Sequence, residues 1–315
     1  MDWLWKCSFC TFSVYVVTIV WWFELYCRDW PKIFEKSYEV QKEFGMIGIK
    51  LNFLYLPRIT LIISIFHVIF SIAHCCIVKY FDKGFLNLME VSSSAGAWAG
   101  LQKWLGYGLM AFTVVLDFFA WNAWHFADTF RAILAIYIWR LLRALNNGVK
   151  DFGSEKLEEV MRLHTKIVDL LRSINQTISG MTFVGSIYMV IYSCLLINYF
   201  LRGYGTIGRA ILTVHFLLKN LIIYGVSADV SAKAHAISDW IQNCTTQKEF
   251  KLNCRSTNKL IIFASQIYSK DSIGFKGLQF FTITASFLTA IFSLIATYTI
   301  VITQLLDQNE TRKDK

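Results

Sequence analysis

The chain has 315 residues, of which 55% are hydrophobic, 16% aromatic and only 17% charged. This composition excludes an ordinary soluble protein, because too few charged residues are present to cover the apolar ones in water. The net charge of +9 comes from Lys and Arg in the connections between apolar runs, so it reports membrane topology and argues against a nucleic-acid partner. We expect one all-α, polytopic membrane domain over residues 1–315, with the lipid bilayer as its solvent.

Six apolar stretches are each long enough to cross about 30 Å of hydrocarbon at 1.5 Å per residue. They lie at about 8–27, 59–80, 104–147, 181–201, 207–230 and 279–306. The third stretch is ambiguous. It is either one long helix that continues into the cytoplasm or two short spans broken near His125 to Asp128, and the second reading gives seven spans in all.

The distribution of Lys and Arg favours six transmembrane helices. With six, the inner segments carry about twice as many basic residues as the outer ones, as the positive-inside rule requires. With seven, the basic stretch 28–58 is forced outside and the asymmetry weakens. The prediction therefore places 28–58, 140–180 and 231–268 in the cytoplasm, and the C-terminus outside the cell.

Residues 155–178 predict a helix that stands in water and packs on two sides. Its apolar residues form two seams with charged residues between them, namely Leu157-Met161-Val168-Leu171 and Val160-Leu163-Ile167-Leu170-Ile174. We expect long helical extensions, formed by about 140–180 and 231–276, to build a cytoplasmic anchor under the membrane part. A helix lying on the membrane surface is the alternative, although it would have one apolar face opposite a mainly basic one.

Five ionisable residues lie within apolar runs: Asp117, Asp128, Arg131, His215 and Lys219. Such groups are costly in a membrane unless they are paired or hydrated, so each is a functional candidate. Asp128 and Arg131 are three residues apart on one helix and are expected to neutralise each other. Lys219 has no partner nearby in the sequence, and Asp117 or Asp128 is its expected counter-ion across helices.

Aromatic residues on the third and fourth apolar runs supply stacking faces and hydroxyl groups. They include Trp121, Trp124 and Phe126 on one run and Tyr188, Tyr192 and Tyr199 on the next. Such residues form an anchoring belt at the membrane interface more often than a ligand pocket, and both readings stay open.

The polar residues of the last apolar stretch, 279–306, fall on one side of a helix. At about 100° per residue they lie within roughly 100° of arc. This stripe consists of Thr282, Ser286, Ala290, Ser293, Thr297, Val301, Gln304 and Gln308. It is typical of a helix that lines an aqueous path. The alternative is that Ser and Thr pack closely or bond to their own turn, but the amide of Gln304 is harder to satisfy in lipid.

No metal site, cofactor or catalytic group is predicted. Cys7 and Cys10 match Cys-x-x-Cys, yet no second pair of ligands stands at a usable spacing, so we expect buried or interfacial thiols. His125 and Asp128 are one helical turn apart but stand alone, which argues against an intramembrane enzyme.

The closing pattern of Thr297-Tyr298, five residues and Gln304-Leu305 resembles the signature of insect gustatory receptors. Further segments are similar to that family: Gly274 to Leu278, the pairs Leu163-His164, Leu170-Leu171 and Ile174-Asn175, Arg140 to Asn146, and 33–58. The resemblance covers most of the chain from about residue 28. Family members have seven helices, so the first helix is expected to be absent from this chain, in agreement with the count of six.

The resemblance implies a ligand-gated, non-selective cation channel for taste in the plasma membrane of sensory cells. It would be a homotetramer or a heteromer with related subunits, and its pore would be lined by 279–306. At the positions that match the family motif, the resemblance implies that the pore and gate residues are Ser293, Thr297, Val301, Gln304 and Leu305. It implies that Tyr298 sets the packing of this helix. A small-molecule tastant would bind within each subunit; the candidates are Asp117, Trp121, Trp124, Tyr188, Tyr192, His215 and Lys219.

Two residues depart from the family pattern. Leu305 replaces the usual Phe, and Thr299 stands where the sugar-sensing branch has Glu, which weakly disfavours a sugar. Alternatives are a non-conducting or accessory subunit, a seven-helix metabotropic receptor, and a transporter. The last two fit less well, because neither of the two prolines lies deep in a span and no internal repeat is evident.

Overall fold

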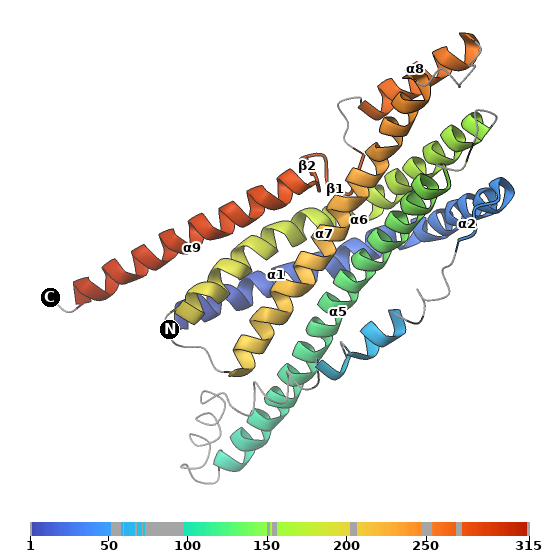
Figure 1. Cartoon of the computed structure of the whole chain (residues 1–315). Coiled ribbons are helices and arrows are strands. Elements are labelled where there is room, and N and C mark those ends of the chain that lie inside the picture. Colours follow the sequence, from blue (N-terminus) through green and yellow to red (C-terminus); the bar gives the residue numbers. More distant parts are fainter. Residues whose placement is uncertain are drawn as a thin grey trace.

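The structure, a computed structural model, is nearly all-helical in the residues that it describes (Figure 1). These are residues 2–51, 58, 60–66, 68–70, 72, 98–149, 152, 156–201, 207–246, 254–268 and 273–313. The helices are α1 (Asp2–Tyr26), α2 (Trp30–Ile47), α5 (Trp98–Gly148), α6 (Leu157–Leu201), α7 (Ile207–Thr246), α8 (Cys254–Tyr268) and α9 (Ala285–Lys313). A 3-10 turn, η1 (Cys27–Asp29), joins α1 to α2.

Three helical stretches of the described part are long and apolar enough to cross a membrane. They are Cys10–Ile47, Leu157–Asn198 and Ala285–Leu305. The predicted span 59–80 lies largely outside the described residues. The count of six transmembrane helices therefore stays a prediction.

The third apolar stretch belongs to one continuous helix, α5, which has 51 residues. At 1.5 Å per residue it is about 75 Å long, more than twice the thickness of the hydrocarbon core. The alternative of two short spans broken near His125 to Asp128 is wrong, because the helix runs through these residues without interruption. α6 and α7, with 45 and 40 residues, also exceed the length of a single span.

The C-terminal part of α5 and the N-terminal part of α6 share one apolar core. Both predicted seams of residues 155–178 are buried, except that Met161 is half-buried. Leu141, Leu142 and Leu145 of α5 are fully buried in the same core. Because the charged residues between the seams remain largely exposed, this part of α6 has the two-sided packing that its sequence predicts.

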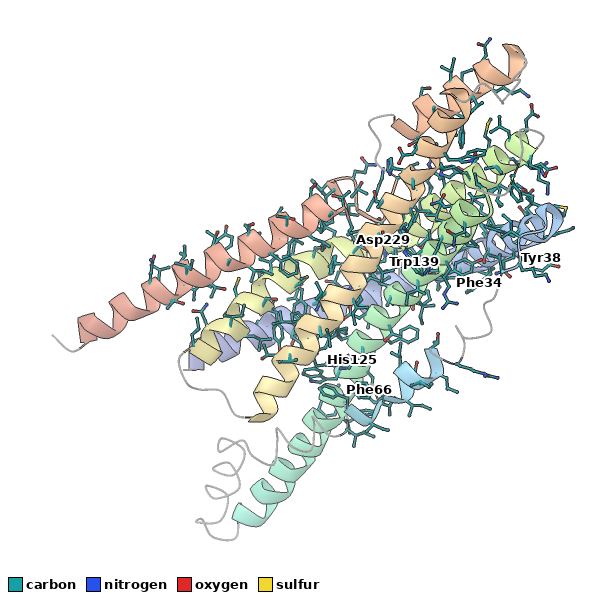
Figure 2. The ribbon with its side chains drawn as sticks, viewed as in Figure 1. Phe34, Tyr38, Phe66, His125, Trp139 and Asp229 are labelled. Carbon is teal, nitrogen blue, oxygen red and sulfur yellow. The ribbon has the colours of Figure 1, made fainter. Side chains whose placement is uncertain are left out.

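Hydrogen bonds and ion pairs between side chains join the helices that surround this core. Glu43 of α2 accepts a hydrogen bond from Lys166 of α6 and lies 3.4 Å from Arg162. Trp139 and Asp229 face each other between α5 and α7 (Figure 2), and the indole nitrogen donates to the carboxylate. Each contact joins helices that are far apart in the sequence.

A small hairpin precedes α9, and its strands are β1 (Lys276–Gly277) and β2 (Phe281–Thr282). Lys276 pairs with Thr282, and the turn holds Leu278 at a positive φ of 53°. The predicted start of the last helix at residue 279 is therefore too early, because the hairpin uses residues up to Thr282 and the helix begins at Ala285. In Figure 1, α9 lies along α6, away from α5.

Candidate functional site

An aromatic cluster fills the space where α1, α5, α6 and α7 meet. It consists of Phe12, Trp121, Trp124, Tyr188, Tyr192 and Phe216. The ring centroid of Phe12 lies 5.2 Å from that of Trp121, and the centroid of Tyr192 lies 4.8 Å from that of Phe216. Trp124 meets Tyr188 edge to face at 5.9 Å. These are the distances and orientations that aromatic pairs prefer.

An ion cluster lies directly beside these rings; it consists of Asp128, Arg131, Lys219 and Tyr15. The Asp128 carboxylate accepts a hydrogen bond from Arg131 on its own helix, and its Oδ2 lies 2.6 Å from Nζ of Lys219 on α7. Tyr15 of α1 donates its hydroxyl to Asp128 Oδ1 at 3.3 Å. The Lys219 ammonium also lies 3.7 Å from the centre of the Trp124 ring, within range of a cation–π interaction.

Two histidines extend the site toward the helical segment that carries Phe66 and Phe70. The ring of His215 stacks on that of Phe70 with a centroid distance of 4.5 Å, and lies 5.6 Å from the ring of His125. Lys219 Nζ is 3.4 Å from His125 Nδ1, within hydrogen-bonding distance. Phe66 also neighbours His215, with a centroid distance of 6.0 Å, and Figure 2 labels Phe66 and His125 in this region.

The structure brings together most of the predicted pocket candidates. Trp121, Trp124, Tyr188 and Tyr192 are all members of the aromatic cluster, and Lys219 contacts it through Trp124. His215 reaches the site through His125. The side chain of Asp117 lies outside the described residues. The counter-ion of Lys219 is Asp128, one of the two that were expected.

Sequence reasoning missed Phe12, Tyr15 and Phe216, which complete the site. Phe12 and Tyr15 are three residues apart and therefore share a helix face. Their stretch is apolar on all sides, so its periodicity marks no particular face. Phe126, in contrast, turns away from the cluster and lines an outer groove between α1 and α5 of about 530 Å³.

No group of three His, Cys, Asp or Glu in the described part of the chain lies close enough together to hold a metal ion. The polar groups of the site are instead hydrogen-bond donors and charges.

The pore-helix candidate, α9, is buried along one edge only. Ile291, Ile295 and Thr299 form this edge, four residues apart. The predicted pore and gate residues all lie on the exposed surface of the single chain; they are Ser293, Thr297, Val301, Gln304 and Leu305. Thr297 donates its hydroxyl to the carbonyl of Ser293, within its own turn. Tyr298 leaves half of its surface exposed.

Two asparagines of α6 form hydrogen bonds with α9 and with the segment that precedes it. Asn175 donates to the carbonyl of Gly274 at 2.8 Å and accepts from the amide of Lys276 at 3.1 Å. Asn198 accepts the hydroxyl of Thr303 at 2.7 Å. The sequence contained no signal for either link, because a polar residue on an apolar helix does not indicate which neighbouring helix it will meet.

A search of known proteins finds a relative, the "Gustatory receptor 5a for trehalose" of Drosophila melanogaster. It is 22% identical over 214 residues, which are 66% of this chain and 46% of that receptor. The chain thus spans about half the length of the curated relative it matches. No family model matches the sequence.

The fold is similar to that of the insect olfactory receptor OR5 from Machilis hrabei. Its structure in complex with eugenol matches with a TM-score of 0.68 at 15% identity, over 94% of this chain and 79% of that one. A second structure of the same receptor gives 0.67 at 14% identity, over 96% and 81%. In sequence and in fold the chain is thus similar to insect chemoreceptors. The predicted all-α fold class is therefore confirmed for the described residues, whereas the count of six transmembrane helices is not.

Proposed function

We propose that this protein is a chemoreceptor, a subunit of a ligand-gated, non-selective cation channel that serves taste, with α9 lining the pore. The observation that carries the proposal is the one-sided burial of α9. The helix packs against the rest of the chain along Ile291, Ile295 and Thr299, while its stripe residues from Ser286 to Gln304 are exposed. A membrane helix with an exposed polar stripe is stable only where that stripe meets water or polar neighbours.

The pore and gate residues have separate tasks in this proposal. Ser293, Thr297 and Val301 line the inner and middle part of the path. Leu305 forms an apolar ring that blocks ions by excluding water, and Gln304 offers an amide that substitutes for ion hydration when the helix turns. Leu305 has 56% of its surface exposed in the single chain, so it is available to meet its copies around an axis.

The assembly is a homotetramer or a heteromer with related subunits. Large apolar residues flank the polar stripe on α9 and are exposed; examples are Phe292, Leu294 and Ile300. Ile261 and Ile262 on α8 are exposed as well. Large apolar residues exposed on a single chain are typical of surfaces that face lipid or another protein. The anchor segments, about 140–180 and 231–276, lie in the cytoplasm, and the C-terminus is extracellular.

A small-molecule tastant binds in the site formed by the aromatic and ion clusters. These clusters join four helices, so a ligand that alters their packing acts on the whole bundle. Sugar is disfavoured as the ligand class, because Thr299 replaces the Glu of the sugar-sensing branch, although the curated relative is named for trehalose.

Whole-cell recording tests the proposal. The chain is expressed alone, with a related subunit, and with an added N-terminal helix, and it is exposed to a panel of tastants that includes trehalose. We expect a ligand-evoked cation current in at least one combination. A chain that reaches the cell surface yet never conducts would instead be an accessory subunit.

A further inference from the structure

The ion cluster contains more positive than negative charge. Asp128 is the one carboxylate in contact with Arg131 or Lys219 among the described side chains. The side chain of Asp128 is 1% exposed, that of Arg131 5% and that of Lys219 9%. An Arg side chain is protonated under all physiological conditions. Lys219 Nζ lies 2.6 Å from Asp128 Oδ2, the distance of a charge-assisted hydrogen bond.

The surplus charge belongs to Lys219. Asp128 and Arg131 are neighbours on α5 and form a neutral pair by themselves. Lys219 comes from α7 and shares Asp128 with that pair. The face of Trp124 compensates part of the surplus, since a cation over an indole ring is stabilised by the ring quadrupole. A buried charge without a counter-ion is nevertheless unfavourable, so the site favours an added negative charge.

A second feature points to the same kind of ligand. Tyr188 is buried, and its hydroxyl has no hydrogen-bond partner in the described part of the chain. Its ring stacks on Tyr15 at 4.5 Å and meets Trp124 at 5.9 Å, so the hydroxyl belongs to the same interior. A phenol can donate one hydrogen bond, and buried donors are almost always satisfied in folded proteins.

We propose that this site binds an organic monocarboxylate with an apolar or aromatic body. The carboxylate accepts hydrogen bonds from Lys219 and Tyr188, and the body packs on the rings of the aromatic cluster. This inference rests on the proposed function in that it assigns the ligand class of the same pocket.

The charge balance separates the candidate ligand classes. A cationic ligand is repelled by the surplus charge on Lys219. A sugar offers hydroxyl groups but leaves that charge uncompensated. A monocarboxylate supplies the single negative charge that balances the cluster, and its apolar body suits a site whose other walls are Trp124, Tyr192 and Phe216.

Binding of 3-phenylpropanoate and of its uncharged methyl ester to the purified chain in lipid nanodiscs tests the proposal, because the two molecules differ in charge while sharing one apolar body. We expect the acid to bind at least tenfold more tightly than the ester. The Lys219→Gln variant should lose this preference while its affinity for the ester is unchanged. It should also fold, because Asp128 keeps Arg131 as its partner.

Two further variants of the site and two control variants on α2 make the experiment more specific. Tyr188→Phe keeps the ring and removes only the unpaired hydroxyl, so we expect roughly tenfold to hundredfold weaker binding of the acid, the value of one charge-assisted hydrogen bond. Lys219→Arg should retain the preference for the acid. Lys42→Gln and Tyr38→Phe remove an exposed charge and an exposed hydroxyl on α2 and should change nothing.

Equal affinity for acid and ester, or a preference that survives in Lys219→Gln, would overturn the assignment. Chloride that competes as well as 3-phenylpropanoate would reassign the site to an inorganic anion and also overturn it. Because binding is measured without current, the two proposals fail separately. A chain that binds the acid but never conducts refutes the channel, whereas one that conducts with neutral tastants and ignores charge refutes the monocarboxylate.

Discussion

Asn198 on α6 is hydrogen bonded to Thr303 on α9, with the Thr303 hydroxyl donating to Asn198 Oδ1 at 2.7 Å. The side-chain amide of Asn198 donates to the carbonyl of Cys194 at 2.9 Å and lies 3.4 Å from that of Thr299. Asn198 is completely buried. Since Thr303 directly precedes Gln304, this link sets the rotation of α9 next to the proposed gate.

Replacement of Asn198 by Leu should destabilise the contact between α6 and α9. It removes both interhelical bonds of a buried amide, and we expect a loss of about 1–3 kcal/mol in stability. Thermal unfolding of the purified protein measures this effect. Thr289→Val is the matched control, because the exposed Thr289 hydroxyl donates within its own turn, and its effect should stay within about 0.5 kcal/mol. Equal shifts for both variants would mean that the Asn198 link is unimportant.

The ion cluster should respond asymmetrically to neutralisation. Asp128→Asn leaves Arg131 and Lys219 buried without an anion, and the loss of one partner of a buried pair costs about 3–5 kcal/mol. Lys219→Gln leaves the neutral pair of Asp128 and Arg131. We therefore expect the surface expression of Asp128→Asn to be strongly reduced and that of Lys219→Gln to be close to normal. The opposite order would contradict the charge balance described above.

Residue 305 should control the resting current. If Leu305 closes the pore by excluding water, Leu305→Ser admits water and then cations without ligand, which raises basal current. Leu305→Phe restores an apolar ring and should leave the gate closed. Gln304→Leu should reduce open-channel conductance because it removes the hydrating amide. Single-channel recording measures both quantities; altered surface expression with unchanged current per channel would assign these residues to packing alone.

Single cysteines on α9 should report which face meets the symmetry axis. Positions 297, 301 and 304 lie on the exposed face, whereas 295 and 299 are buried against the same chain. Oxidative crosslinking between subunits should therefore be efficient at the first three positions and weak at the last two. Uniform crosslinking at all five would be incompatible with a central pore formed by α9.

Acid should weaken the packing of α6 in the anchor segment, through His164. This residue lies outside the predicted span 181–201, and its Nε2 is 3.0 Å from the carbonyl oxygen of Ala234. Burial lowers the pKa of His164 from 6.5 to about 4, so the folded chain resists a proton that the unfolded chain accepts.

The stability supplied by neutral His164 is complete above pH 6.5, falls as the pH decreases and is lost below about pH 4. Linkage predicts a loss of about 2 kcal/mol between pH 7 and pH 5. Thermal unfolding at the two pH values measures it, and His164→Gln should remove this part of the pH dependence. A pH dependence identical in the variant would show that other groups cause it.

Local patterns in the sequence determined the helical class, the membrane character and the faces of individual helices. Residues 155–178 illustrate this point, since their two apolar seams are both buried in the structure. A 3.6-residue period states which side chains share a face, and in water an apolar face must be covered. The stripe of Ser293, Thr297, Val301 and Gln304 follows from the same rule.

Only the tertiary structure decided how the faces meet. The continuity of α5 through His125, the pairing of Lys219 with Asp128 and the link from Asn198 to Thr303 all depend on how distant parts of the chain are placed. A buried charge or amide must find a partner, and the sequence states that need. Which residue becomes the partner depends on the register and the crossing angles of the long helices. The packing of all the helices together sets this register and these angles.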